Sequence, residues 1–83
     1  MRAEILELMR VIAAGIAADE MLAANISELS LKFRHIGKID DAGMLHTLSE
    51  FHRYNAVRLR DELADLTDKY LMLCDDGPDL SEA

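Results

Sequence analysis

Histidine and glutamate side chains that could bind a metal occur in both halves of the chain. His46 and Glu50 are four residues apart, so on a helix their side chains share one face. His35 is expected near the same level on the other half, with Glu28 two turns before it. Carboxylates and imidazoles from facing helices form di-iron sites in bundles, although the usual Glu-x-x-His spacing is absent here. One hypothesis is therefore iron or zinc binding by several associated hairpins, and the alternative is surface ion pairing.

His52 is the residue that could accept a phosphoryl group. Dimerisation domains of two-component kinases share a helical-hairpin architecture, but an acid normally follows their histidine, whereas Arg53 follows His52. His52 and Asn55 interrupt an otherwise aliphatic stripe, and Asn25 is expected opposite them. We interpret Asn25, His52 and Asn55 as a buried polar layer that determines register and partner number. Phosphotransfer through His52 is the alternative.

Other signatures of catalysis are missing from the sequence. It has no glycine-rich phosphate loop, nucleophile elbow or His-Glu-x-x-His motif. Asp19 and Glu20 are adjacent, so on a helix they point about 100° apart and do not converge on a substrate. Cys74 precedes two acids, which disfavour a reactive thiolate. The sequence therefore predicts a protein that is not an enzyme and has no catalytic residue or cofactor.

Two long segments of strong helix formers must position these side chains. Gly37 suits the left-handed position that ends a helix, and Asp40 or Asp41 suits the N-cap of the next one. A short connection makes the two helices antiparallel. We predict an all-α, antiparallel two-helix hairpin over residues 1–74, followed by an acidic, disordered tail over 75–83. The expected bounds are helix 2–36, turn 37–41 and helix 41–74.

Apolar residues recur in alternating steps of three and four, which is typical of packed helices. In the first helix the stripe is interrupted at Asp19 and resumes at Leu22, so we expect a packing irregularity there. If the turn is centred near residue 40, Asp19 and Glu20 lie close to Arg60, and one of these acids is expected to pair with it.

The segment from Val11 to Ala18 is apolar on every side, and such a helix needs neighbours on several sides. A second hairpin supplies them in a four-helix bundle or a larger helical assembly, most simply a homodimer. A helix from another polypeptide is the alternative. The expected oligomer interface consists of Ile5, Met9, Ile12, Ala13, Ile16 and Ala17.

Charge and hydropathy narrow the range of partners. The 83 residues carry 16 acidic and 9 basic side chains, a formal net charge of −7. This balance argues against binding to nucleic acid or to an anionic membrane surface. The longest uncharged apolar run, Val11 to Ala18, is far shorter than the ~20 residues that span a bilayer. We therefore expect a soluble, cytoplasmic protein.

Asp61, Asp65 and Asp68 form an acidic strip along one side of the second helix. The strip is interpreted either as a solvated face or as a docking face for a basic protein partner. Taken together, the sequence predicts a non-catalytic helical oligomerisation and protein-interaction module, which would act as an adaptor, regulator or small chaperone-like protein. A metal-binding, ferritin-like assembly of hairpins and histidine phosphotransfer are the alternative functions.

Overall fold

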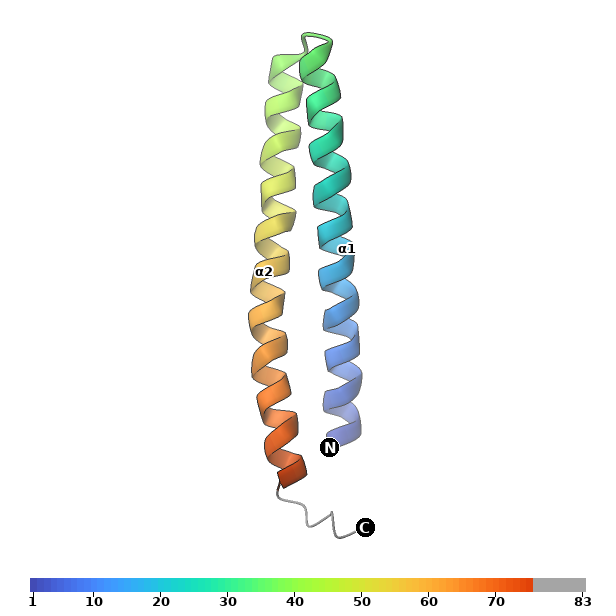
Figure 1. Ribbon diagram of the computed structural model, residues 1–83, viewed down its shortest axis with the longest axis vertical. Coiled ribbons are helices and arrows are strands. Elements are labelled where there is room, and N and C mark those ends of the chain that lie inside the picture. Colours follow the sequence, from blue (N-terminus) through green and yellow to red (C-terminus); the bar gives the residue numbers. More distant parts are fainter. Residues whose placement is uncertain (76–83) are drawn as a thin grey trace.

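The computed structural model describes residues 1–75 as two antiparallel α-helices that lie side by side (Figure 1). Helix α1 (Arg2–His35) and helix α2 (Ile39–Asp75) form a rod of 65 × 15 × 13 Å. The predicted all-α hairpin is confirmed. Apart from Asp75, the expected acidic tail lies outside the described residues. Within residues 1–75, neither helix has a segment with the length and apolar character that crossing a membrane requires.

Gly37 ends α1 in the way its sequence position predicts. Its φ of +87° lies in the left-handed region, where glycine avoids the clash of a Cβ atom. The Gly37 amide donates to the Arg34 carbonyl at 3.1 Å, and the Lys38 amide donates to the Phe33 carbonyl at 2.9 Å. These two bonds form a Schellman motif, which satisfies the last carbonyls of the helix.

The turn is shorter than expected, because α2 begins at Ile39 rather than near Asp41. The Lys38 carbonyl already accepts the Ala42 amide at 3.0 Å. Asp40 and Asp41 consequently lie inside the first turn of α2, and the expectation that one of them is the N-cap is wrong. Their negative charges still stabilise the positive end of the helix macrodipole.

Each helix has one continuous seam of partly or fully buried residues, with steps of four and three throughout. The expected irregularity at Asp19 is therefore absent, because the seam continues through Asp19 and Ala23 in the same register. Leu22, whose hydrophobicity predicts a seam position, is instead exposed. The seam of α1 contains Ile5, Met9, Ile12, Ile16, Asp19, Ala23, Ile26, Ser30 and Phe33, and that of α2 contains Ala42, Leu45, Ser49, His52, Ala56, Leu59, Leu63, Leu66, Tyr70 and Leu73.

Small residues occupy the fully buried seam positions near the turn. Ala23, Ser30, Ala42, Ser49 and Ala56 are all at most 4% exposed. The Ser30 hydroxyl donates to the Ala42 carbonyl at 2.8 Å, and the Ser49 hydroxyl donates to the Ala23 carbonyl at 2.9 Å. A serine side chain is short, so it reaches the backbone of the other helix only where the two helices are close. We call the part of the hairpin between the turn and the level of Asp19 the turn half.

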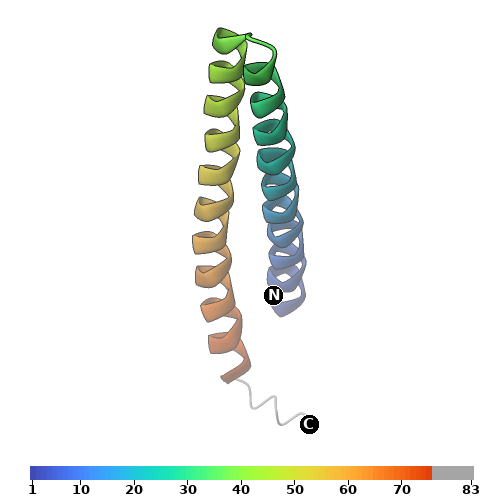
Figure 2. The same ribbon diagram turned by 45° about the horizontal axis from the view of Figure 1, so that its top comes forward.

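The other part, the terminal half, has large aliphatic side chains in its seam. Ile12 and Ile16 of α1 and Leu59 and Leu63 of α2 occupy seam positions there. Both views show the ribbons closest beside the turn and farther apart in the terminal half (Figures 1 and 2). The size of the seam residues accounts for this difference, since larger side chains hold the helix axes farther apart.

Two glycine substitutions test the backbone assignments at the turn. Gly37→Ala places a Cβ in the left-handed region and should lower the free energy of unfolding by about 1 kcal/mol. Gly43→Ala should raise it by about 1 kcal/mol, because Gly43 is inside α2 and a Cβ there meets nothing within 4 Å. Thermal unfolding followed by circular dichroism measures both. Equal effects of the two variants would contradict the cap assignment.

The close approach in the turn half is tested at Ser49. Ser49→Leu should lower the free energy of unfolding by about 1–3 kcal/mol, because a larger side chain overpacks the contact between the helices. Ser49→Ala keeps the space and loses one hydrogen bond, which should cost about 1 kcal/mol. Urea unfolding of both variants gives the comparison. A Leu variant as stable as the Ala variant would show that the helices are not held close there.

Candidate functional site

A polar layer centred on Asp19 separates the two halves of the hairpin. One oxygen of the Asp19 carboxylate lies 2.9 Å from Nδ1 of His52, and Nδ2 of Asn55 donates to the other oxygen at 2.8 Å. The Asp19 and His52 side chains are only 13% and 20% exposed. An ionised carboxylate can only accept hydrogen bonds, so Nδ1 of His52 carries the proton in this contact.

The layer extends to Arg58 on the surface of α2. Arg58 donates to Oδ1 of Asn55 at 2.8 Å and lies 3.7 Å from Glu62. The hydrogen bond from His52, followed by that from Asn55, holds the pKa of the Asp19 carboxyl below its usual value. Asp19 therefore stays ionised at neutral pH while it lies between the helices.

The register of the hairpin explains why Asp19 belongs to this layer and Asn25 does not. The midpoints of the residue numbers in the hydrogen-bonded pairs Asp19–Asn55 and Ala23–Ser49 are 37 and 36, so the turn is centred there. The sequence predicts a turn centred near residue 40, which would place different residues opposite each other. Asn25 is exposed, so the prediction that it lies in the buried layer is wrong. The charge of Asp19 in the apolar stripe was the signal that pointed to a polar partner. Its neighbour Glu20 does form the expected ion pair with Arg60.

The residue after His52 is Arg53, so α2 does not supply the acid that normally follows the histidine of two-component dimerisation domains. The carboxylate beside His52 is instead that of Asp19 on α1. The contact with Asp19 takes one ring nitrogen and orients the ring, while about four-fifths of the side chain is buried. A ring held in this way can favour a nucleophilic second nitrogen, as in catalytic histidine–carboxylate pairs. Burial between two helices restricts the approach of a phosphoryl donor. The geometry therefore favours a structural role for His52.

The four metal-ligand candidates are all exposed, and they do not form one cluster. Glu50 lies 2.6 Å from Arg53, which fits the ion-pairing alternative. Within the described residues, no three His, Cys, Asp or Glu side chains are grouped so that they could hold a metal ion. These candidates are Glu28, His35, His46 and Glu50.

The residues expected to bind a second copy divide into two groups. Ile5, Met9, Ile12 and Ile16 lie in the seam of the hairpin itself, where α2 covers part of their surface. The remaining two, Ala13 and Ala17, are exposed. The apolar segment is thus partly covered within one chain, because its large side chains face α2.

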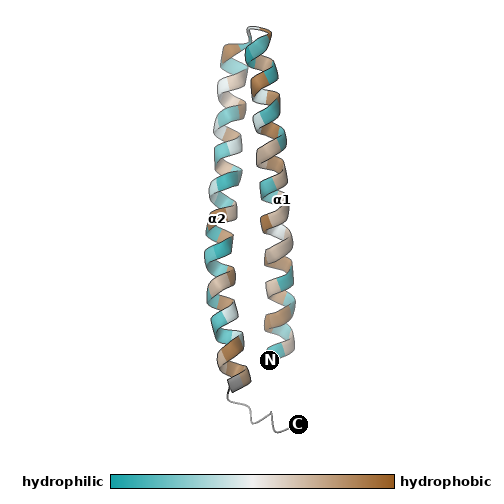
Figure 3. Cartoon of the chain, viewed as in Figure 1, coloured by the Kyte–Doolittle hydropathy of each residue, from teal (hydrophilic) through white to brown (hydrophobic). Residues whose placement is uncertain are grey.

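Asp61, Asp65 and Asp68 are exposed on α2 in the terminal half. Asp65 borders an open groove whose other sides include Leu8 and Lys69. Figure 3 shows that the middle of α2 is mainly hydrophilic, whereas apolar residues extend along more of α1. The acidic strip therefore remains accessible to a partner.

Six large apolar side chains form an exposed surface along one flank of the turn half. Leu22 and Leu29 come directly before the buried Ala23 and Ser30, and Leu48 comes directly before the buried Ser49. In an antiparallel pair these positions lie on the same side of the seam. We call this surface the turn-half face, and its residues are Leu22, Leu29, Ile36, Met44, Leu48 and Phe51.

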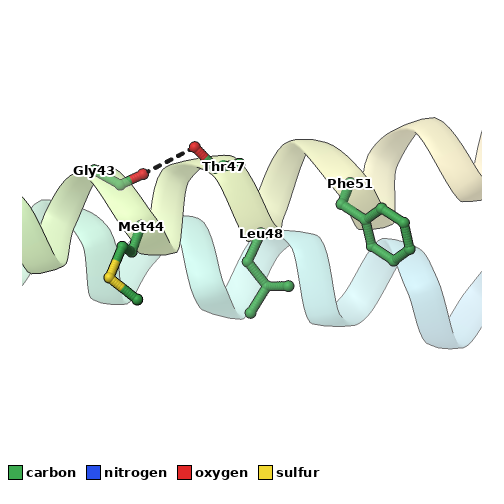
Figure 4. A pocket seen from close by; sticks show the side chains of 5 residues that line it. All are labelled: Gly43, Met44, Thr47, Leu48 and Phe51. Atoms are coloured by element: carbon green, nitrogen blue, oxygen red, sulfur yellow. Dashed lines mark hydrogen bonds between the residues drawn. The ribbon is translucent and has the colours of Figure 1, made fainter.

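Figure 4 shows the α2 part of this face. Met44, Leu48 and Phe51 extend from one side of the helix, away from Thr47, whose hydroxyl donates to the Gly43 carbonyl at 3.1 Å. These five residues line a shallow, open groove. Gly43 adds no side chain, and the space where a Cβ would lie is empty. The groove can therefore receive an apolar side chain from outside the hairpin.

The turn-half face is large for a protein of this size. Its side chains are 43–72% exposed. Since a large side chain presents roughly 200 Å², the six together expose roughly 600 Å², the upper end for the largest apolar patch of a typical monomer. Apolar patches at this upper end are often functional.

Comparison with protein-family models, curated proteins and solved structures gives no match for this chain. The function proposed below therefore depends on the residues and the geometry described above.

The polar layer predicts a specific pH dependence. Because the pKa of Asp19 is lower in the folded state, its contribution to stability is present above the unfolded value of about 4 and is lost as the pH falls through the folded value. Asp19→Asn should therefore be less stable than the unmodified protein at pH 7, and this difference should shrink in acid. Urea unfolding between neutral and acid pH measures it. Asp61→Asn, at an exposed position, is the control, and a difference for Asp19→Asn that does not change with pH would contradict the assignment.

Proposed function

We propose that this protein is a non-catalytic helical interaction module, which self-associates into a four-helix bundle or a larger helical assembly and acts as an adaptor, regulator or small chaperone-like protein. The observation that carries this proposal is the exposed turn-half face. Water contact with so much apolar surface is unfavourable, and a second hairpin removes it.

The small interior of the hairpin supports the same proposal. In the described part of the chain the buried hydrophobic residues are Ile16, Ala23, Ala42 and Ala56, and three of these are alanines. Burial of so few large side chains offsets little of the conformational entropy that is lost when two long helices form. Association with another hairpin would bury the large side chains that a single hairpin leaves exposed.

The acidic strip supports the adaptor role. Asp61, Asp65 and Asp68 lie in the terminal half, away from the turn-half face, so an assembly formed through that face leaves them accessible. A row of carboxylates attracts a basic partner and speeds its encounter more than it tightens the complex. We therefore propose a basic protein surface as the second partner.

Self-association is tested directly by mass. Light scattering during size-exclusion chromatography should give at least twice the 9.3 kDa mass of one chain, with a shift toward the single chain on dilution. Circular dichroism on the same samples should show helix loss together with dissociation. A fully helical single chain at every concentration would contradict the proposed function.

A further inference from the structure

We propose that the turn-half face is covered by the same face of a second copy of this chain, with the two turns side by side and both hairpins pointing in the same direction. This inference rests on the proposed function, since it names the partner and the geometry of the self-association. The area of the face, the distribution of charge along the flank and two charged residues at its edge support this geometry.

The area of the face matches what a dimer of this kind needs. If each copy covers roughly 600 Å², the two together bury about 1,200 Å², the lower limit for stable and specific interfaces. The face combines aliphatic side chains with Met44 and Phe51, and no charged residue lies among them. A surface of this composition complements itself, and a two-fold axis brings the same patch of both copies together.

Charge along the flank argues against a head-to-tail dimer that overlaps over its full length. The same flank of α2 carries Arg58 and Glu62 in the terminal half. Full head-to-tail overlap pairs each α2 about its midpoint with the other, so that Leu48 and Phe51 of one copy lie opposite the stretch of the other that carries Glu62, Asp65 and Lys69. Burial of a charge against apolar side chains is costly unless the charge is paired.

Lys32 and Asp41 indicate the relative direction of the two copies. Lys32 is three residues after Leu29, and Asp41 is seven residues before Leu48, so both border the turn-half face, and both are exposed. Among the ion pairs of the described residues, none includes either of them.

A two-fold axis along the rod places α1 of one copy opposite α2 of the other. Lys32 and Asp41 lie at nearly the same level of the hairpin, because the midpoint of their residue numbers, 36.5, is close to the midpoint of 36 for the hydrogen-bonded pair Ala23 and Ser49. Lys32 of each copy therefore faces Asp41 of the other copy, and the dimer contains this contact twice. With the turns side by side, Leu22 and Leu29 also lie opposite the apolar residues of α2.

The first experiment uses two leucines of α1. Leu29→Glu should give a single chain by light scattering, because it places a charge in the proposed contact. Leu31→Glu is the matched control, since Leu31 is also exposed but points to the other flank, and this variant should keep the mass of the dimer. Circular dichroism verifies that both remain helical. Phe51→Lys gives a second test from α2 if Leu29→Glu does not fold.

The second experiment tests the direction of the two copies. Lys32→Asp should weaken dimer formation about tenfold, since two attractive contacts become repulsive, and the double variant Lys32→Asp with Asp41→Lys should restore it. Small-angle scattering should give a dimer whose long axis is close to the 65 Å of one hairpin.

The outcomes separate this inference from the proposed function. A dimer that survives both Leu29→Glu and Phe51→Lys would overturn the assignment of the face and leave self-association intact. A dimer much longer than one hairpin, or a double variant as weak as Lys32→Asp, would overturn the direction of the two copies. An unmodified protein that is a single chain at all concentrations would overturn both.

Discussion

The close approach of α1 and α2 beside the turn is the constraint on which the rest of the structure depends. Ser30 and Ser49 reach backbone carbonyls of the opposite helix, and this contact is possible only because alanine and serine occupy the buried seam positions. At these fully buried positions the seam has no room for leucine. Leu22, Leu29 and Leu48 must then lie beside the seam, where they are exposed. The packing that holds the hairpin together is therefore also the cause of its apolar outer face.

The polar layer divides the hairpin into two halves that differ in their packing and in their surface. On one side of Asp19 the helices are close and their outer flank is apolar. On the other side the seam holds large aliphatic side chains, and the flank of α2 is charged. A partly buried carboxylate with two donors tolerates little change of register, because a shift of either helix would leave it unpaired. Asp19, His52 and Asn55 thus align the small residues of α1 with those of α2.

Much of the fold follows from the sequence by local rules. The long segments without proline, the glycine at position 37 and the short connection led to an antiparallel hairpin, and the cap at Gly37 has the expected geometry. The seam was harder to predict, because hydrophobicity ranks leucine above alanine and serine. Which of them is buried depends on the distance between the helices, and this is a tertiary property. The position of Asn25 relative to the polar layer depended on the length of the turn, where an error of a few residues moves every cross-helix pair.

The shortness of that turn has a consequence for the order in which the molecule folds. Only residues 36–38 lie between the helices, so closing this loop costs little chain entropy. The hydrogen bond from Ser30 to the Ala42 carbonyl is a contact between the helices that lies near this loop. Each later contact extends the pairing by one helical turn toward the termini. We therefore expect the two helices to pair progressively from the loop toward the termini. The amide hydrogens beside Ser30 should be protected from exchange earliest during refolding, and those near the ends of the helices last.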